Sequence, residues 1–430
     1  MDRQSRIHVV RATHRLRGLE ALKQPSDPSL GAPLVVILAG VSAALHVAKL
    51  PPAIAALQQA MGVSLLQAGF LLSLVQLAGM SAGVACGALA DALGLRRSML
   101  AGLLLLALAS AAGGVVRDVG ALLLLRAVEG FGFLLVVLPG PGLIRRLVEP
   151  QRLSRVLGLW GTYMPFGTAL ALLAGPMWIA AFGWQAWWWL LAALSLAMAL
   201  WLARAVPSAP VSAALQPTPW LQRLRLTLAA RGPWLVAMTF AVYAGQWLAV
   251  IGFLPTIYLQ AGVSGAATGA LTALAAAVNM AGNVVSGRLQ QAGVPPTRLL
   301  NVGFCTMGLA ALAAFGAIDG WALPAVLRYA AVLVFSLVGG LIPATLFALA
   351  VRLAPSEQTL STSVGWMQQW SALGQFCGPP LVAWAAGRSG GWQWTWVATG
   401  ACSLLGLLLA ARIGALLRST SQPSALRDNA

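Results

Sequence analysis

The chain has 430 residues, of which 59% are hydrophobic and 9% are charged. Soluble domains average about 45–50% apolar and about 25% charged residues, so this composition excludes an ordinary water-soluble protein. The formal net charge of +17 would suit a nucleic-acid-binding protein, but the basic residues gather between long apolar segments. We therefore expect a membrane protein whose charge reflects its topology and which does not bind nucleic acid.

The first segment, residues 1–31, is polar and basic and lacks the apolar stretch of a signal peptide, so we expect a cytoplasmic tail. About twelve apolar segments follow, each reaching or approaching the ~20 residues that a helix needs to cross the hydrocarbon core. The predicted spans are 33–57, 65–90, 98–116, 120–143, 156–179, 186–203, 233–258, 267–287, 299–318, 322–351, 360–386 and 393–414. This pattern predicts an all-α membrane protein in the lipid bilayer.

A polar, proline-rich stretch interrupts the apolar pattern in the middle of the chain, at residues 204–232. It contains four arginines and no acidic residue, as expected of a cytoplasmic linker. The linker divides the chain into an N-terminal six-helix bundle, residues 32–203, and a C-terminal six-helix bundle, residues 233–414. Residues 415–430 are predicted to form a cytoplasmic C-terminal tail.

Short sequences recur between the two predicted halves. Gly183-Trp184, before the predicted sixth span, returns as Gly391-Trp392 before the twelfth, at an offset of 208. A second repeat, in spans five and eleven, has an offset of 207. The near-constant offset indicates duplicated halves with the same orientation.

Basic residues fill every second loop, which places both termini in the cytoplasm.

The turn between the second and third spans contains two glycines, an acidic residue and two arginines at a defined spacing: Gly87, Asp91, Gly94, Arg96 and Arg97. This spacing resembles the signature loop of the major facilitator superfamily. The resemblance implies a fold of two six-helix bundles and a gate at this loop, which holds the halves together in the outward-facing state.

Two departures from the family pattern predict a weaker gate, since Ala92 and Leu95 occupy positions where basic residues are usual.

A second family motif is similar to the sequence Arg126-x-x-Glu129-Gly130 in span four. The resemblance implies a role for Arg126 in proton coupling. An arginine and a carboxylate three residues apart share one helix face. A structural ion pair is the alternative interpretation.

Four ionisable residues lie well inside the predicted spans: His46, Lys49, Arg126 and Glu129. Such residues are functional candidates, because a charge in the bilayer is unfavourable by at least about 2.5–3.5 kcal/mol. At about 1.5 Å per residue, the two pairs overlap in depth. We expect one cluster with a net positive charge that binds an anionic substrate, with Glu129 as proton carrier and His46 as the second. Alternatively, Lys49 extends to the outer membrane surface.

Amide and aromatic side chains at membrane depth complete the candidates for substrate binding. These are Tyr163, Gln246, Asn279, Gln368 and Trp370. Helix packing is the alternative role for each, because amides inside lipid must find partners. The four cysteines have no CxxC or Cys/His spacing, so we expect neither a metal site nor a disulfide, and no cofactor.

These observations predict a secondary transporter, not an enzyme: a monomer in the inner membrane of a bacterium that moves a small organic or inorganic anion, with protons. The run from Lys49 through Pro51 and Pro52 resembles cyanate and nitroimidazole permease relatives. The alternatives are proton-driven efflux of hydrophobic drugs and, more remotely, a sensor that does not transport. Drug efflux is disfavoured because Gly175-Pro176 lies near the outer end of span five, whereas drug/proton antiporters carry this pair within the span.

Overall fold

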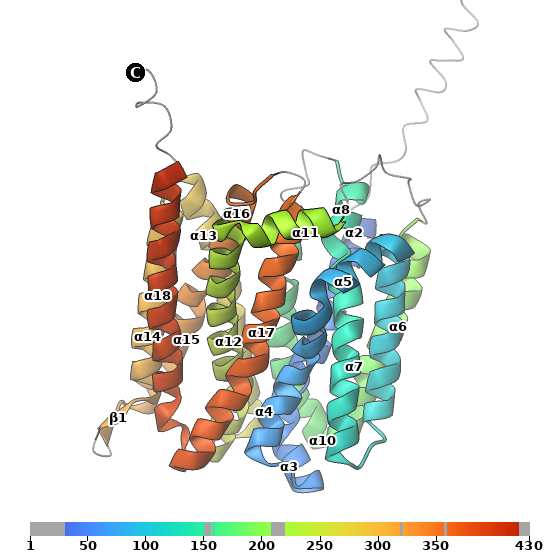
Figure 1. The fold of residues 1–430 in the computed structure, drawn as a ribbon. Helices are drawn as coiled ribbons and strands as arrows, with labels where there is room; N and C mark the ends of the chain where they lie inside the picture. Colours follow the sequence, from blue (N-terminus) through green and yellow to red (C-terminus); the bar gives the residue numbers. More distant parts are fainter. Residues whose placement is uncertain are drawn as a thin grey trace, which may run out of the picture.

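The structure, a computed structural model, describes residues 31–149, 156–157, 159–207, 220–318, 321–356 and 359–420. The side chains at 84–85, 87–92, 220, 318, 321, 360–361 and 420 lie outside the described part. Long helices run side by side along one common direction, and α11 (Trp220–Ala229) lies across one end of them (Figure 1). The last helix ends at the same side of the molecule as α11 (Figure 1).

The first half consists of helices from the start of the described chain to Ala205. These are α2 (Gly31–Ala48), η1 (Pro51–Ala53), α3 (Ile54–Met61), α4 (Leu65–Ser73), η2 (Leu74–Gln76), α5 (Leu77–Leu93), α6 (Leu95–Gly113), α7 (Val119–Val137), α8 (Gly140–Leu147) and α10 (Tyr163–Ala205).

The second half follows α11. Its elements are α12 (Arg231–Gln260), α13 (Gly265–Gln291), α14 (Pro296–Phe315), β1 (Ala317–Ile318), β2 (Trp321–Ala322), α15 (Ala325–Gly339), α16 (Leu341–Arg352), α17 (Leu360–Ser389), η4 (Trp392–Trp394) and α18 (Thr395–Thr420).

Several predicted spans are interrupted where the sequence removes a hydrogen-bond donor. Pro51 and Pro52 have no amide hydrogen, so α2 ends at Ala48 and a short 3-10 turn precedes α3. Pro139 likewise separates α7 from α8. The first span therefore contains a helix end inside the bundle, and that end positions the site described below.

By length and composition, ten helices of the described residues could cross a membrane. One of them, α10, contains most of the predicted fifth span and all of the sixth, with a bend at Gly183, whose φ of +84° suits only glycine without strain. Another predicted span, α17, is not among the ten; it carries several amides, including Gln368 and Gln369.

The all-α prediction is confirmed, since all long elements are helices and only the two-residue strands β1 and β2 pair between α14 and α15. Two predicted boundaries differ from the structure. The linker predicted at 204–232 contains the ten-residue helix α11, in which Leu221, Leu224 and Leu228 recur at helical spacing. The tail predicted from residue 415 begins as helix, since α18 continues to Thr420.

The halves pack against each other through small residues. A Cβ on Gly69 would lie 3.0 Å from the main chain of Pro380, and a Cβ on Gly79 would lie 2.8 Å from Ala372. On the other flank, Gly269 of α13 lies against α10. One apolar core lies mainly in the second half and two lie mainly in the first. The α4–α5 segment therefore packs on α17, and α10 packs on α13.

Candidate functional site

The four ionisable residues expected at membrane depth come together around one carboxylate. Glu129 Oε1 accepts a hydrogen bond from Lys49 Nζ, and its Oε2 accepts one from Arg126 at 2.6 Å. His46 Nδ1 lies 3.8 Å from Oε1. All four residues are at most 1% exposed. We call these four residues the charged cluster.

The break in the first span explains the place of Arg126. In a continuous helix the carbonyl of Val47 would accept a bond from residue 51, but Pro51 has no amide hydrogen. Arg126 donates to this oxygen at 3.4 Å and to the carbonyl of His46 at 2.7 Å. Its Nε donates to the carbonyl of Leu71 near the end of α4, at 3.1 Å. A cation at a helix C-terminus also interacts favourably with the helix dipole.

Lys49 lies immediately after α2, where the chain leaves the helix. Its ammonium donates to Ser110 Oγ at 2.9 Å and lies 4.7 Å from the centre of the Trp188 ring. Ser110 in turn donates to the carbonyl of Trp188. The main-chain oxygen of Lys49 accepts a bond from Trp187 at 3.0 Å. Thus α6 and α10 hold Lys49 inside the first half, and its ammonium does not extend to the surface.

His46 connects the carboxylate to two buried serines. Its Nε2 lies 2.7 Å from Ser195 Oγ, which lies 3.1 Å from Ser42 Oγ. Ser42, Ser110 and Ser195 were not predicted from the sequence, because single serines are common in apolar helices. Ser42 alone had a usable signal, since it precedes His46 by four residues and shares its helix face.

The cluster carries two permanent or near-permanent cations and one carboxylate. With His46 neutral, it has an excess of one positive charge. Every hydrogen bond and ion pair described for its side chains stays within the first half. Its polar contacts are therefore supplied by α2, α4, α6, α7 and α10.

The other predicted candidates lie apart from the cluster. Tyr163 packs beside Trp160 in a tilted arrangement, with ring centres 4.8 Å apart. Asn279 donates to Tyr243 Oη at 3.0 Å and to the carbonyl of Ser336 at 2.8 Å, which is a packing role.

Trp370 is part of an aromatic group with Trp234 and Trp366, with centre-to-centre distances of 5.6 and 6.0 Å. Gln368 is partly buried on α17. The structure therefore does not assemble these residues and the charged cluster into one site.

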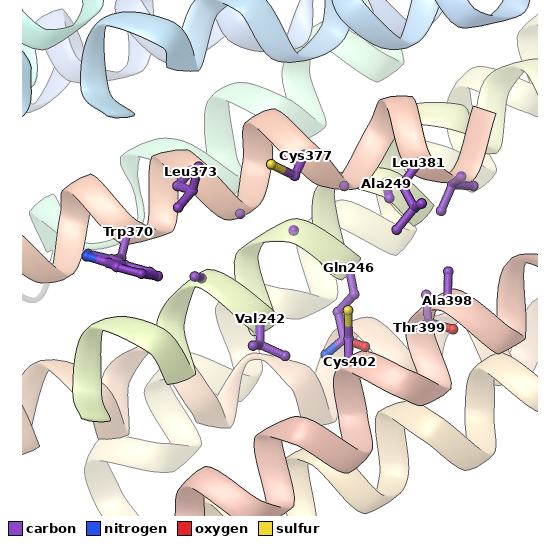
Figure 2. Close-up of a pocket in the computed structure, with 15 residues that line it drawn as sticks. Val242, Gln246, Ala249, Trp370, Leu373, Cys377, Leu381, Ala398, Thr399 and Cys402 are labelled. Carbon is purple, nitrogen blue, oxygen red and sulfur yellow. The ribbon is translucent and has the colours of Figure 1, made fainter. Parts of the chain in front are cut away.

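Gln246 and Trp370 instead line a cavity of about 210 Å³ between α12, α17 and α18 (Figure 2). Its wall is almost entirely apolar and includes Leu373, Cys377 and Leu381. Figure 2 shows Gln246 extending from α12 toward Cys402 of α18. This cavity belongs to the second half alone.

Amides also join the two halves. Gln76 Nε2 donates to Gln375 Oε1 at 3.0 Å, and Gln369 Nε2 donates to the carbonyl of Met80 at 2.9 Å. Gln76 and Gln375 are not among the site residues predicted from the sequence. Their depth within apolar helices was the available signal, because buried amides require partners.

The predicted gate lies at the turn from α5 to α6. Gly94 has φ +86°, which permits the sharp turn, and Arg96 donates to the carbonyl of Ala203 at 2.6 Å. Arg97 is exposed. The side chains at Gly87 and Asp91 lie outside the described part. The described contact of Arg96 is within the first half.

Comparisons with known proteins give the family context. Residues 35–376 match the profile of the Major Facilitator Superfamily. Over 250 residues the chain is 28% identical to the Cyanate transport protein CynX of Escherichia coli (strain K12), covering 56% of this chain and 62% of that protein. The match thus spans less than two thirds of that relative.

Two solved structures of a bacterial homologue of the human lysosomal transporter Spinster resemble this fold. The inward-facing, unoccupied structure has a TM-score of 0.72 at 16% identity, covering 90% of this chain and 96% of that one. The inward-facing, occupied structure has a TM-score of 0.70 at 15% identity, with the same coverage. At these identities the likeness concerns the fold.

Proposed function

Since this chain belongs to the Major Facilitator Superfamily, we propose that it moves a small anion together with protons, by alternating access between its halves. The chain is a multi-pass membrane transporter and not an enzyme. The observation that carries the proposal is the carboxylate of Glu129, which is buried and shared by Lys49 and Arg126.

The carboxylate occupies the position that a substrate anion would take. Lys49 and Arg126 each direct one hydrogen bond at Glu129. A proton on Glu129 would neutralise the carboxylate and release both cations from it. Their donors would then be available to an anion, which forms the same charge-assisted hydrogen bonds. The proton and the anion therefore bind together.

Charge balance supports this exchange. Before loading, the cluster has two cations and one carboxylate; after loading, it has the same cations, a neutral Glu129 and one substrate anion. The net charge is the same in both states, so neither state adds a buried charge to the membrane interior. A proton without an anion, or an anion without a proton, would leave an unbalanced charge. This requirement supports symport.

His46 is the proposed route of the proton to Glu129. Its Nδ1 has no hydrogen-bond partner among the described residues and lies 3.8 Å from the carboxylate. Its other nitrogen contacts Ser195, which in turn contacts Ser42. Histidine suits this role because one ring nitrogen can accept a proton while the other releases one.

We propose about twelve membrane crossings, by treating α10 as two crossings on either side of Gly183 and by adding α17. The basic helix α11 and the end of α18 lie at the same side of the molecule (Figure 1). The excess of arginine in the loops at this side supports a cytoplasmic location for both termini. A monomer in the bacterial inner membrane remains our prediction.

The relative from Escherichia coli supports an anionic cargo, because its name describes it as a cyanate transport protein and cyanate is a small anion. Efflux of hydrophobic compounds is the second candidate, favoured by the apolar cavity of the second half. A lipophilic cation would find an excess of positive charge at the charged cluster. We therefore rank anion transport first.

The proposal is tested with purified protein in liposomes. Radiolabelled cyanate, in a series with nitrate and formate, is expected to stabilise the protein against heat and to enter faster when the outside is acidic. Lys49→Met should raise the anion concentration that gives half-maximal stabilisation by at least roughly tenfold, since a charge-assisted hydrogen bond is lost. Arg225→Met, at an exposed position on α11, is the control.

Two results would contradict the proposal. Stabilisation by tetraphenylphosphonium and by none of the anions would identify hydrophobic efflux instead. Anion binding without any flux under an imposed pH gradient would identify a sensor that does not transport.

A further inference from the structure

The cavity between α12, α17 and α18 has features of a second binding site (Figure 2). It encloses about 210 Å³, and no charged residue lines it. None of the residues of the charged cluster borders it. An ion would be strongly disfavoured here, because nothing compensates a charge removed from water. The cavity suits an uncharged molecule.

One wall residue carries a hydrogen-bond donor without an acceptor. Gln246 is 2% exposed, and its Oε1 accepts a bond from Ser403 at 3.2 Å. Its Nε2 has no hydrogen-bond partner among the described residues. A buried N–H group without a partner is unfavourable, and most such groups in native proteins are paired. A ligand oxygen in the cavity would supply the missing acceptor.

The depth of Gln246 restricts the ligand. The residue lies midway along α12, roughly 20 Å from either end at about 1.5 Å per residue. The hydrocarbon core is about 30 Å thick, so the free donor lies near its centre. The ester oxygens of phospholipids lie at the edges of that core. The acceptor must therefore belong to a molecule that is soluble in the hydrocarbon itself.

The rim of the cavity indicates how such a molecule enters. Cys377 and Leu381 of α17 border the cavity, and both are exposed on the flank of the helix bundle, Leu381 by 51%. At this depth the surroundings of the bundle are lipid tails. The entrance thus connects the cavity with the bilayer and not with water.

We propose that this cavity binds an uncharged lipophilic molecule with a carbonyl-type oxygen, which enters from the bilayer and accepts a hydrogen bond from Gln246 Nε2. The molecule is comparable in size with two or three fused rings. This site is independent of the anion proposed for the first half, and each proposal can fail without the other.

Fluorenone and fluorene test the hydrogen bond directly, because they share a carbon frame and differ in the carbonyl oxygen. Benzophenone, a photoreactive ketone, is cross-linked to the purified protein in lipid nanodiscs, and the labelled peptides are identified by mass spectrometry. Labelling is expected within residues 241–249 and 370–402, which line the cavity. Fluorenone should compete at roughly fivefold lower concentration than fluorene, the effect of one neutral hydrogen bond.

Two variants separate hydrogen bonding from shape. Gln246→Leu should abolish the difference between fluorenone and fluorene, while Ala398→Phe should fill the cavity and remove the labelling. Gln290→Leu, outside the cavity, should change neither result. Equal competition by both compounds on the unmodified protein would overturn the proposal, as would labelling spread evenly over the lipid-facing helices. The comparison on the unmodified protein decides the matter even if a variant fails to fold.

Discussion

The guanidinium of Arg126 donates a hydrogen bond to the main-chain oxygen of His46, at 2.7 Å. This contact joins the side chain of the fourth span to the end of a helix that two prolines interrupt in the first. The same arginine binds Glu129. Arg126 therefore both holds the broken helix in place and neutralises the carboxylate, so its structural and functional roles cannot be separated by simple removal.

Arg126→Ala is expected to destabilise the protein by about 3–5 kcal/mol, because it leaves buried groups without their charged partner. Thermal unfolding in detergent would measure the loss. Arg225→Ala, at an exposed site on α11, should change stability by less than about 0.5 kcal/mol. Equal stability of the two variants would show that the contacts of Arg126 contribute little to folding.

Glu129→Gln is expected to separate anion binding from proton binding. The neutral amide resembles the protonated carboxyl group, so Lys49 and Arg126 stay available to the anion at every pH. The affinity for the anion should become nearly independent of pH between 5 and 8, while accumulation driven by a pH gradient is lost. Binding and uptake are measured on the same preparation. Persisting gradient-driven accumulation would exclude Glu129 as the proton carrier.

Ser195→Ala is expected to slow proton-coupled uptake severalfold while it leaves anion affinity within about twofold. The substitution removes the partner of His46 Nε2 but does not touch Lys49 or Arg126. Initial rates at several outside pH values, compared with binding affinities, distinguish a slow proton step from a damaged site. A parallel loss of affinity and rate would instead assign Ser195 a packing role. Thr239→Ala, whose hydroxyl bonds within α12, is the control.

The bond between Gln76 and Gln375 should contribute about 0.6 kcal/mol, the average for side-chain hydrogen bonds inside membranes. The two single alanine variants and their double variant form a cycle that isolates this energy. Unfolding free energies provide the measurement. Strict additivity would show that the two amides do not couple the halves in the ground state.

Gly374→Val is expected to prevent correct packing of α17 on α12. A Cβ at this position would lie 1.9 Å from the carbonyl oxygen of Ala241, far inside any permitted contact. Gly387→Ala on the same helix meets nothing within 4 Å and serves as the control. Expression and monodispersity in detergent report the outcome. A well-folded Gly374→Val protein would mean that α17 and α12 do not approach this closely.

The sequence by itself determined the class of protein. Its apolar segments and its arginine-rich loops follow from the need to satisfy helix backbones in lipid, and this need acts locally along the chain. The family followed from the Gly-Asp-Gly-Arg turn and the Arg126-x-x-Glu129 motif, both contained in single short segments. Depth along two helices also indicated that His46 and Lys49 could meet Arg126 and Glu129.

Only the tertiary structure decided what surrounds these residues. Helix rotation is set by packing, so the sequence could not indicate that Ser110, Ser195 and Trp188 line the charged cluster or that Arg126 binds the carbonyls before Pro51. Nor could it indicate that Gln246 lies in a separate cavity with one unpaired donor. Hydropathy specifies that a side chain is buried, whereas its partners depend on how the helices are oriented about their axes.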